Sequence, residues 1–235
     1  MRAFLKRLFA RALMTIALVA GANVSITGAA NGGTSAAIDT SGASLLIFHL
    51  SHYFATATSV SDSKGNTWTG LTAQGSDEPR SRIFYAENPT VGTNHTFTIT
   101  GVGSYSTGEV AGFSGAATTT VADQETGAVV NPGTTLSTGS ITPSENNCLV
   151  VAGLSVNKDG SPYAINASMT ITDQFDYESG VNEGGALAYI VQTTAAAINP
   201  QWSGFASGAA AATIASFKAA GGAAGKPWYY YANQG

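Results

Sequence analysis

The sequence predicts an all-β fold: an antiparallel β-sandwich of the jelly-roll type, built from two similar halves. Three observations support this prediction. Only 10% of the residues are charged while 28 of 235 are glycine, a balance that suits short strands joined by tight turns. From Val24 to Lys218, short β-rich runs alternate with clusters of glycine, asparagine, proline and serine, and no helical period is sustained. The second part of this body also repeats the pattern of the first.

The first segment, residues 1–22, has two interpretations. Its basic start, apolar stretch and small residues near position 22 are the three parts of a secretory signal peptide. Its apolar residues also share one helical face, largely opposite the basic ones, as in an amphipathic helix that docks on a membrane or in a partner's groove. Under the second interpretation we expect Phe4, Leu8 and Phe9 to dock on a partner, and any membrane contact to run through this segment.

The body, residues 23–220, carries strand-like runs that recur at one constant offset of 104 positions. SLLIFHLS at 44–51 matches CLVVAGLS at 148–155, RIFYAE matches LAYIVQ around Tyr85 and Tyr189, and EVAGFSGA matches TIASFKAA through Phe113 and Phe217. Three matches in the same order predict two halves, about 24–118 and 119–220, with the same succession of strands.

Two arrangements satisfy this repeat. The halves can form the two sheets of one jelly-roll sandwich, or they can stand as tandem immunoglobulin-like domains of roughly 100 residues each. The connecting segment at 117–134 is polar but is punctuated by Val121, Val129 and Val130, which is unlike a bare linker. We therefore favour the single sandwich.

The stretch SDSKGN, residues 61–66, is the most conspicuous polar cluster of the first half. Gly65 supplies positive φ, Asn66 tolerates left-handed geometry, and Asp62 can accept bonds from nearby backbone N–H groups. A calcium loop needs several converging oxygen ligands, whereas a lysine lies in the middle of this stretch. We predict a turn, joining two strands as a hairpin.

A second polar loop, NKDGSP at 157–162, looks more like a cation loop because Asn157, Asp159 and Ser161 alternate along it. It lacks a distant carboxylate that would complete a calcium site. We therefore expect a surface turn here, keep calcium as the weaker interpretation, and expect no cofactor.

Patterns that support catalysis are weak. On a strand, His49 and His52 face opposite sides and cannot share a metal. Acids that share strand faces, such as Asp123 with Glu125, lack the closely spaced motif of jelly-roll glucanases. Nucleophile-elbow and phosphate-loop motifs are absent from the sequence. The single cysteine, Cys148, opens an apolar run and is expected to be a buried hydrophobe. We expect no enzymatic activity.

The charge distribution bears on partners. The formal net charge is −4, but four of the ten basic residues lie in the first eleven positions, where there is no acid. Residues 12–235 therefore carry six basic against 14 acidic groups, a formal net of −8. A body of this sign repels phosphate backbones, so no nucleic-acid partner is expected for it.

The C-terminal segment, residues 221–235, differs from the body in composition. A Gly/Ala linker leads to KPWYYYANQG, in which Trp228, Tyr229, Tyr230 and Tyr231 follow a proline that favours extended backbone. Aromatic side chains are large anchors that lose little entropy on docking. This tail can fold back on its own sandwich, dock on a neighbouring subunit, or stack on a sugar.

In order along the chain, LLIFHLS, VSDSKGNTWTGL, RIFYAENP, HTFTIT, EVAGFSGA, DQETG, CLVVAGL and ATIASFKAA resemble a known module. It is the jelly-roll (concanavalin-like) β-sandwich of about 200 residues found in tailed-phage virion proteins and in bacterial surface or secreted proteins. The resemblance covers roughly residues 24–220 and implies the fold. It implies no catalytic residues, because the family carries no agreed set.

Two functions follow as expectations. The first is a virion component, such as a capsid decoration, fibre or tail-associated subunit, which binds other virion subunits or itself and forms a homo-oligomer. The alternative is a secreted or cell-surface carbohydrate-binding module whose glycan contacts would be Trp68, Tyr105, Tyr163, Tyr177 and Trp202. A glycan-active enzyme using Asp173 or Asp176 is the least favoured.

Overall fold

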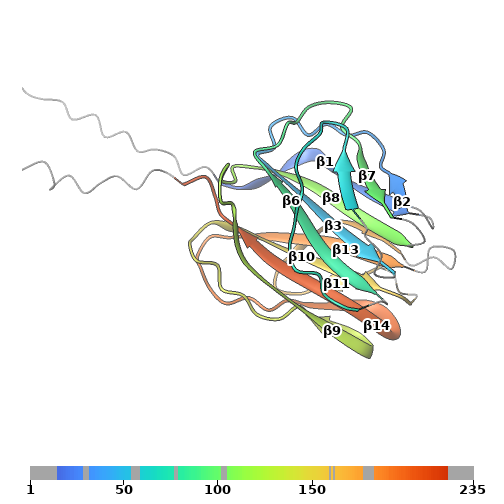
Figure 1. Ribbon diagram of the computed structural model, residues 1–235. Coiled ribbons are helices and arrows are strands. Elements are labelled where there is room, and N and C mark those ends of the chain that lie inside the picture. Colours follow the sequence, from blue (N-terminus) through green and yellow to red (C-terminus); the bar gives the residue numbers. More distant parts are fainter. Residues whose placement is uncertain are drawn as a thin grey trace, which may run out of the picture.

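The computed structural model describes residues 15–28, 32–53, 59–76, 79–101, 105–158, 160, 162–176 and 183–221 (Figure 1). All the regular elements in these ranges are strands, and all the strand pairs are antiparallel. The prediction of an all-β, antiparallel sandwich is therefore confirmed.

The first half of the chain forms two sheets. The larger sheet has the order β1 (Ala17–Gly28), β8 (Ser106–Ser114), β3 (Leu45–His52), β6 (Arg80–Glu87) and β5 (Thr69–Gly70). The smaller sheet has the order β2 (Gly32–Thr34), β7 (Phe97–Thr100) and β4 (Ser59–Asp62). Leu46, Phe48 and Leu50 of β3 pack against Phe97 and Ile99 of β7 in a shared core. Two facing sheets with this alternation of strands make a jelly-roll-like unit.

The second half repeats this order of strands. Its main sheet runs β9 (Ala122–Ser137), β14 (Gln201–Phe217), β10 (Cys148–Val156), β13 (Gly184–Gln192) and β12 (Thr170–Phe175), which is the order β1-β8-β3-β6-β5 of the first half. The short β11 (Ala164–Ile165) pairs with the start of β14. The repeat in the sequence thus corresponds to a repeat of topology.

The two main sheets pack face to face, as the stacked layers of Figure 1 show. Because successive side chains of a strand point to opposite faces, Leu45 and Ile47 of β3 face the second half while Leu46 and Phe48 face β7. All residues of β3 and of β10 are buried for this reason. We call the layer between the main sheets the interlayer core; Leu45, Ile47, Ile83, Ala111 and Phe113 meet Leu149, Val151, Leu187, Ala215 and Phe217 there.

This arrangement differs in one respect from both predicted alternatives. Each half supplies one of the two central sheets, as expected for a single sandwich. The first half also has an outer sheet, and each half has a hydrophobic core of its own in addition to the interlayer core. Burial on both faces explains why the central strands read as continuous apolar runs in the sequence, without the alternation of a half-exposed strand.

The predicted N-terminal element is corrected in the part that the structure describes. Ala17 and Leu18 pair with Ser114 and Phe113 in β1, and Ile16 is buried in the interlayer core, so this part is a strand and not a helix. Phe4, Leu8 and Phe9 lie outside the described residues, as do Trp228, Tyr229, Tyr230 and Tyr231 of the predicted tail.

Candidate functional site

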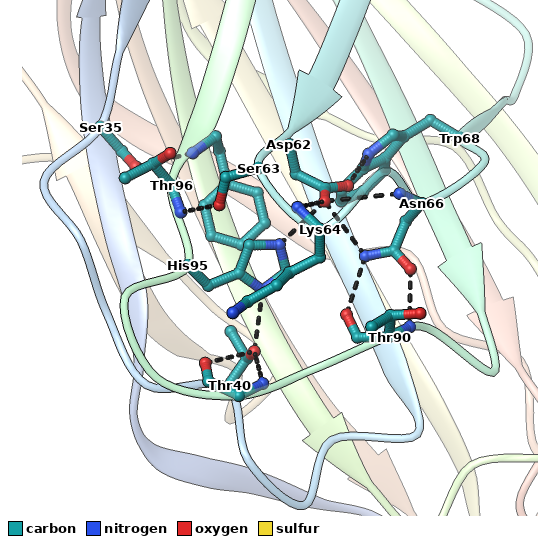
Figure 2. A network of polar contacts seen from close by, with 12 residues as sticks. Ser35, Thr40, Asp62, Ser63, Lys64, Asn66, Trp68, Thr90, His95 and Thr96 are labelled. Atoms are coloured by element: carbon teal, nitrogen blue, oxygen red, sulfur yellow. Dashed lines mark hydrogen bonds and ion pairs between the residues drawn. The ribbon is translucent and has the colours of Figure 1, made fainter.

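Two buried polar clusters stand out among the described residues, and the first centres on Asp62 at the end of β4 (Figure 2). Asp62 Oδ1 accepts hydrogen bonds from the Lys64 N–H at 2.7 Å and from Asn66 Nδ2 at 3.2 Å. Asp62 Oδ2 accepts one from Trp68 Nε1 at 2.7 Å, and His95 Nε2 lies 3.0 Å from Oδ1. We call these five residues the Asp62 clasp.

The clasp favours the ionised carboxylate. Burial alone would raise the pKa of Asp62, but the bonds from His95, Trp68 and the backbone N–H groups outweigh it and hold that pKa below its ordinary value. A carboxylate saturated by donors of its own chain is a structural anchor, because few lone pairs remain for a ligand.

The clasp ties several loops to the outer sheet. The His95 ring stacks on Phe97 with centroids 4.4 Å apart, and its Nδ1 lies 2.8 Å from the Thr40 hydroxyl. Trp68 packs edge-on against Phe48 and Phe97 at 5.7 and 6.2 Å between centroids. The stretch 61–66 is therefore a turn, as predicted. It is not a hairpin, because β4 pairs with β7 and β5 with β6, so the turn crosses from the outer to the main sheet.

The second cluster lies between the two halves, and we call it the interlayer polar cluster: His49, Ser81, Glu109 and Thr213. His49 Nδ1 is 2.7 Å from Glu109 Oε2, and its Nε2 is 2.8 Å from Ser81 Oγ. The Ser81 hydroxyl is in turn 3.1 Å from that of Thr213 on β14. This Glu-His-Ser chain has the connectivity of a proton relay. All four residues are buried, with no more than 3% of any exposed, and the contact between Ser81 and Thr213 joins the two halves.

Burial raises the pKa of the Glu109 carboxyl; the bond and charge of His49 oppose this, and the charge of Asp173 adds to it. The pKa of Asp173, on β12, is also raised by burial, against opposing bonds from Gln174 and Asn23. Ser51 extends the polar region by donating to Glu183 Oε2 at 2.9 Å or to the Gly184 carbonyl at 3.0 Å. The interlayer is thus apolar at one end of the strands and polar at the other.

Sequence reasoning missed this cluster, although it placed His49 and His52 on opposite strand faces. The signal was in the pleat of β3, where His49 and Ser51 continue the face that begins with Leu45 and Ile47. A second signal was Glu109, a lone charge in an otherwise uncharged strand. A buried charge needs a partner, and that requirement could have linked the two strands.

Of the predicted glycan contacts, Trp202 and Tyr163 are corrected. Both are buried in the core of the second half, at 0% and 3% exposure, and neither has a free ring face for a sugar. Trp68 is half-buried in the clasp. Tyr105 is half-buried and its ring meets that of Tyr53 edge-on at 6.2 Å. Tyr177 lies outside the described residues.

The predicted acid and cation positions serve local structure where they are described. The Ser144 N–H and hydroxyl donate to Asp123, at 2.8 and 2.6 Å, and the Thr72 N–H and hydroxyl donate to Glu125, at 2.9 and 3.1 Å. In NKDGSP, Asn157 Oδ1 accepts from the Ala209 N–H at 3.2 Å, while Asp159 and Ser161 lie outside the described residues. Among described residues, no three His, Cys, Asp or Glu side chains are arranged to hold a metal ion.

Two small hollows flank β9. One, of about 110 Å³, includes Val129 and Val130, and the other, of about 120 Å³, includes Asp123 and Glu125. Both are smaller than the roughly 300–1,000 Å³ of typical small-molecule sites. Cys148 is buried, and burial raises the pKa of its thiol to about 11. In the part of the chain that the structure describes, no helix is long and apolar enough to cross a membrane.

The two ends of the described chain meet at Gly115. A Cβ on Gly115 would lie 2.5 Å from the Thr15 carbonyl oxygen, and the Ala220 N–H donates to the Gly115 carbonyl at 2.8 Å. We call this end of the molecule, marked by Thr15, Gly115 and Ala220, the terminal pole; Figure 1 shows it on the left. Tyr53 and Tyr105 mark the opposite end, the distal pole, because β3 and β8 run between the two.

Comparisons with known proteins add little. No family model matches the sequence, and no curated protein matches it. Among solved structures, the chain is aligned with oxalate decarboxylase from Bacillus subtilis at 9% identity, covering 87% of this chain and 76% of that one, with a TM-score of 0.11. A similarity of this size carries no argument about fold or function.

Proposed function

We propose that the protein is a non-enzymatic interaction protein: a phage virion component, such as a capsid decoration, fibre or tail-associated subunit. In this proposal the terminal segments attach the protein to other virion subunits or to further copies of itself. The β-sandwich body is displayed away from the point of attachment. The resemblance of residues 24–220 to modules of tailed-phage virion proteins supports this class.

One observation carries the proposal: both terminal segments emanate from the terminal pole. Residues 1–14, with four basic and several apolar residues, join the body at Thr15, and residues 222–235, with Trp228 to Tyr231, join it next to Ala220. Two docking segments that share one origin can engage one partner surface together, which raises the effective concentration of each for its site. The distal pole then faces away from that surface.

The rigid body also suits display. Its central strands β3 and β10 are buried on both sides, and its polar clusters bond to their own chain. Elements that share large buried faces move together, so the distal ends of the central strands keep a fixed relation to the attachment point.

The test begins with purified virions of the phage or prophage that carries the gene, analysed by mass spectrometry. Peptides of this protein at a stoichiometry comparable with other structural subunits are the expected result. Virions that assemble normally and lack the protein would exclude the virion class.

The attachment mode is tested with a variant lacking residues 222–235 and one with Trp228, Tyr229, Tyr230 and Tyr231 all changed to serine. We expect both to fold, judged by the thermal midpoint of the body, and to be depleted from virions at least tenfold. The matched control is Tyr105→Ser, an aromatic removal at the distal pole, which should leave incorporation unchanged. Equal incorporation of all three variants would contradict attachment through this tail.

The alternative function is a secreted or cell-surface carbohydrate-binding module. It is favoured by the Tyr53–Tyr105 pair at the distal pole, since aromatic rings beside a loop end can stack on sugars. Glycan-array binding by the full chain that is lost in Tyr105→Ala, and retained in the tail variants, would support this function over the first. No binding to the array by the wild-type chain would set it aside.

A further inference from the structure

The contacts between the main sheets follow an approximate two-fold symmetry. Tyr85 meets Phe217 edge-on at 5.4 Å, and Phe113 meets Tyr189 at 5.2 Å, with interplanar angles of 62° and 64°. Tyr189 and Phe217 are the counterparts of Tyr85 and Phe113 at the 104-residue offset, so each contact is the other with the two halves exchanged. This reciprocity is the mark of an isologous interface, in which the same patch is used on both sides.

The edge strands of the two main sheets follow the same approximate two-fold symmetry. β1 lies against β12, where Asn23 Nδ2 donates to the Thr172 carbonyl at 3.1 Å. Between the exchanged elements, Glu125 of β9 accepts a hydrogen bond from the N–H of Thr72, which follows β5. The two halves therefore pack as two copies of one unit would pack in a dimer.

The symmetry breaks at the interlayer polar cluster. At the 104-residue offset, the counterparts of His49, Ser81 and Glu109 are Gly153, Gly185 and Thr213. Each polar residue of this set in the first half thus corresponds to a smaller residue in the second.

The two glycines face His49 and Glu109 across the interlayer. A Cβ on Gly153 would overlap the His49 imidazole ring. A Cβ on Gly185 would lie 2.9 Å from Glu109 Oε1 and 3.1 Å from Thr107 Oγ1. Neither glycine has a positive φ, so their backbone conformation accepts any residue. It is the space taken by His49 and Glu109 that requires glycine at these two positions.

We propose that the inner faces of the two halves recognise each other as unlike partners. The face that carries His49, Ser81 and Glu109 fits only a face that carries Gly153, Gly185 and Thr213. Its partner is a C-terminal half, from the same chain or from a second copy, and two N-terminal halves cannot pair in the same way.

Sterics and charge both enforce this pairing. Two N-terminal faces related by the same axis would bring two imidazole rings into the space that now holds one ring and a glycine. They would also bury two Glu109 carboxylates and lose the hydrogen bond between Ser81 and Thr213. Buried like charges and unpaired polar groups act as elements that reject the wrong partner.

The test exchanges the two sets of residues across the axis in the full chain. The first variant is His49→Gly/Ser81→Gly/Glu109→Thr, the second is Gly153→His/Gly185→Ser/Thr213→Glu, and the third combines all six changes. Urea unfolding midpoints and the mass by light scattering are measured for each. We expect both triple variants to unfold at lower urea than the wild type. The second should be the less stable of the two, because it places a second set of His, Ser and Glu side chains opposite the first.

The sixfold variant rebuilds the same network on the opposite side and should be a monomer that unfolds at higher urea than either triple variant. If the second triple variant does not fold, recovery of a folded sixfold variant is itself the expected rescue. A sixfold variant that is no more stable than the less stable triple variant, or that does not fold while the first triple variant does, would overturn the proposal.

A double-mutant cycle with smaller substitutions tests the packing of Gly153 against His49. Gly153→Ala should lower the urea midpoint in the wild type and have little effect in a His49→Ala background, because the clash partner is gone. Gly221→Ala, at a glycine with open space around it, is the control and should change nothing. Equal losses from Gly153→Ala in both backgrounds would count against size complementarity at this position.

Discussion

At the scale of single residues, the polar groups of this protein act inside it. Asp62 closes a turn by accepting from a backbone N–H, a side-chain amide and an indole, and Glu109 is held by His49 between the halves. The two carboxylates lie in contrasting environments. Several hydrogen-bond donors surround Asp62 and together lower its pKa. Glu109 is fully buried, and this burial outweighs the bond and charge of His49, so the pKa of Glu109 is raised.

Asp62→Asn tests the clasp. The native pKa of Asp62 is below its ordinary value of 3.8, so its ionised form adds stability above that value, which is lost as the pH falls through the native pKa. The variant should be less stable by about 1–3 kcal/mol at neutral pH, because a buried site loses its charge-assisted bonds. Its urea midpoint should also fall less than that of the wild type below about pH 4. Parallel curves for the two proteins would contradict this role.

Glu109→Gln tests the interlayer polar cluster, and here we expect the opposite dependence of stability on pH. The native pKa of Glu109 is above its ordinary value of 4.5, so the stability associated with its neutral form is lost as the pH rises through the native pKa. Glutamine cannot ionise and should remove that loss. We expect the variant to gain stability relative to the wild type as the pH is raised from about 4 to 8. Glu125→Gln, at an exposed carboxylate, is the control. An equal gain of stability with pH in the two variants would show that Glu109 is not the source of the effect.

At the scale of elements, the pattern of residues predicted the strands and their repeat, but it did not predict how the sheets are layered on one another. The apolar runs of β3 and β10 correspond at the 104-residue offset, and both are buried on two faces. A continuous apolar run indicates double burial, yet it does not say which strand covers which face. That information lies in pairs such as Tyr85 with Phe217, which are distant in sequence and meet only once both halves are folded.

The same limit applies to the polar sites. The turn at Asp62 could be predicted because glycine and asparagine at 65 and 66 follow it directly. His95, which completes the clasp, is 33 positions away, and Thr213 is 132 positions from Ser81. The first part of β1, up to residue 22, was missed as a strand because these residues continue an apolar pattern that also suits a helix.

Phe113→Ala and Phe217→Ala test the equivalence of the two central sheets. Both side chains are fully buried in the interlayer core at positions related by the repeat. Each substitution should cost about 3–5 kcal/mol in the free energy of unfolding, since it removes a large buried ring and leaves a cavity. Val129→Ala, at a side chain that is 59% exposed, should change stability by no more than about 0.5 kcal/mol. Losses that differ more than twofold between the two phenylalanines would argue against equivalent environments.

At the scale of the whole molecule, the interlayer core makes the two halves one cooperative unit. Neither main sheet can be exposed without uncovering apolar residues such as Leu45 and Leu149. A half that separated from the other would also leave the His49–Glu109 pair facing water on one side. The topology resembles that of two linked units, but the shared core predicts that both halves unfold in one cooperative transition.

Tryptophan fluorescence can test this cooperativity. Trp68 lies in the first half and Trp202 in the second, so variants that keep only one of them report on each half separately. With Trp228 also changed to phenylalanine, both reporters should give the same urea midpoint within error. Two separated midpoints would show that the halves unfold independently and that the interlayer core contributes little.

The meeting of Thr15, Gly115 and Ala220 at one place has a consequence for how the chain could be connected. A short bridge from residue 221 back to residue 15, with the backbone opened between Gly115 and Val121, would yield a circular permutant in which the second half is synthesised first. Every strand would keep its neighbours, because the order of segments along the polypeptide does not enter the contacts between the two sheets.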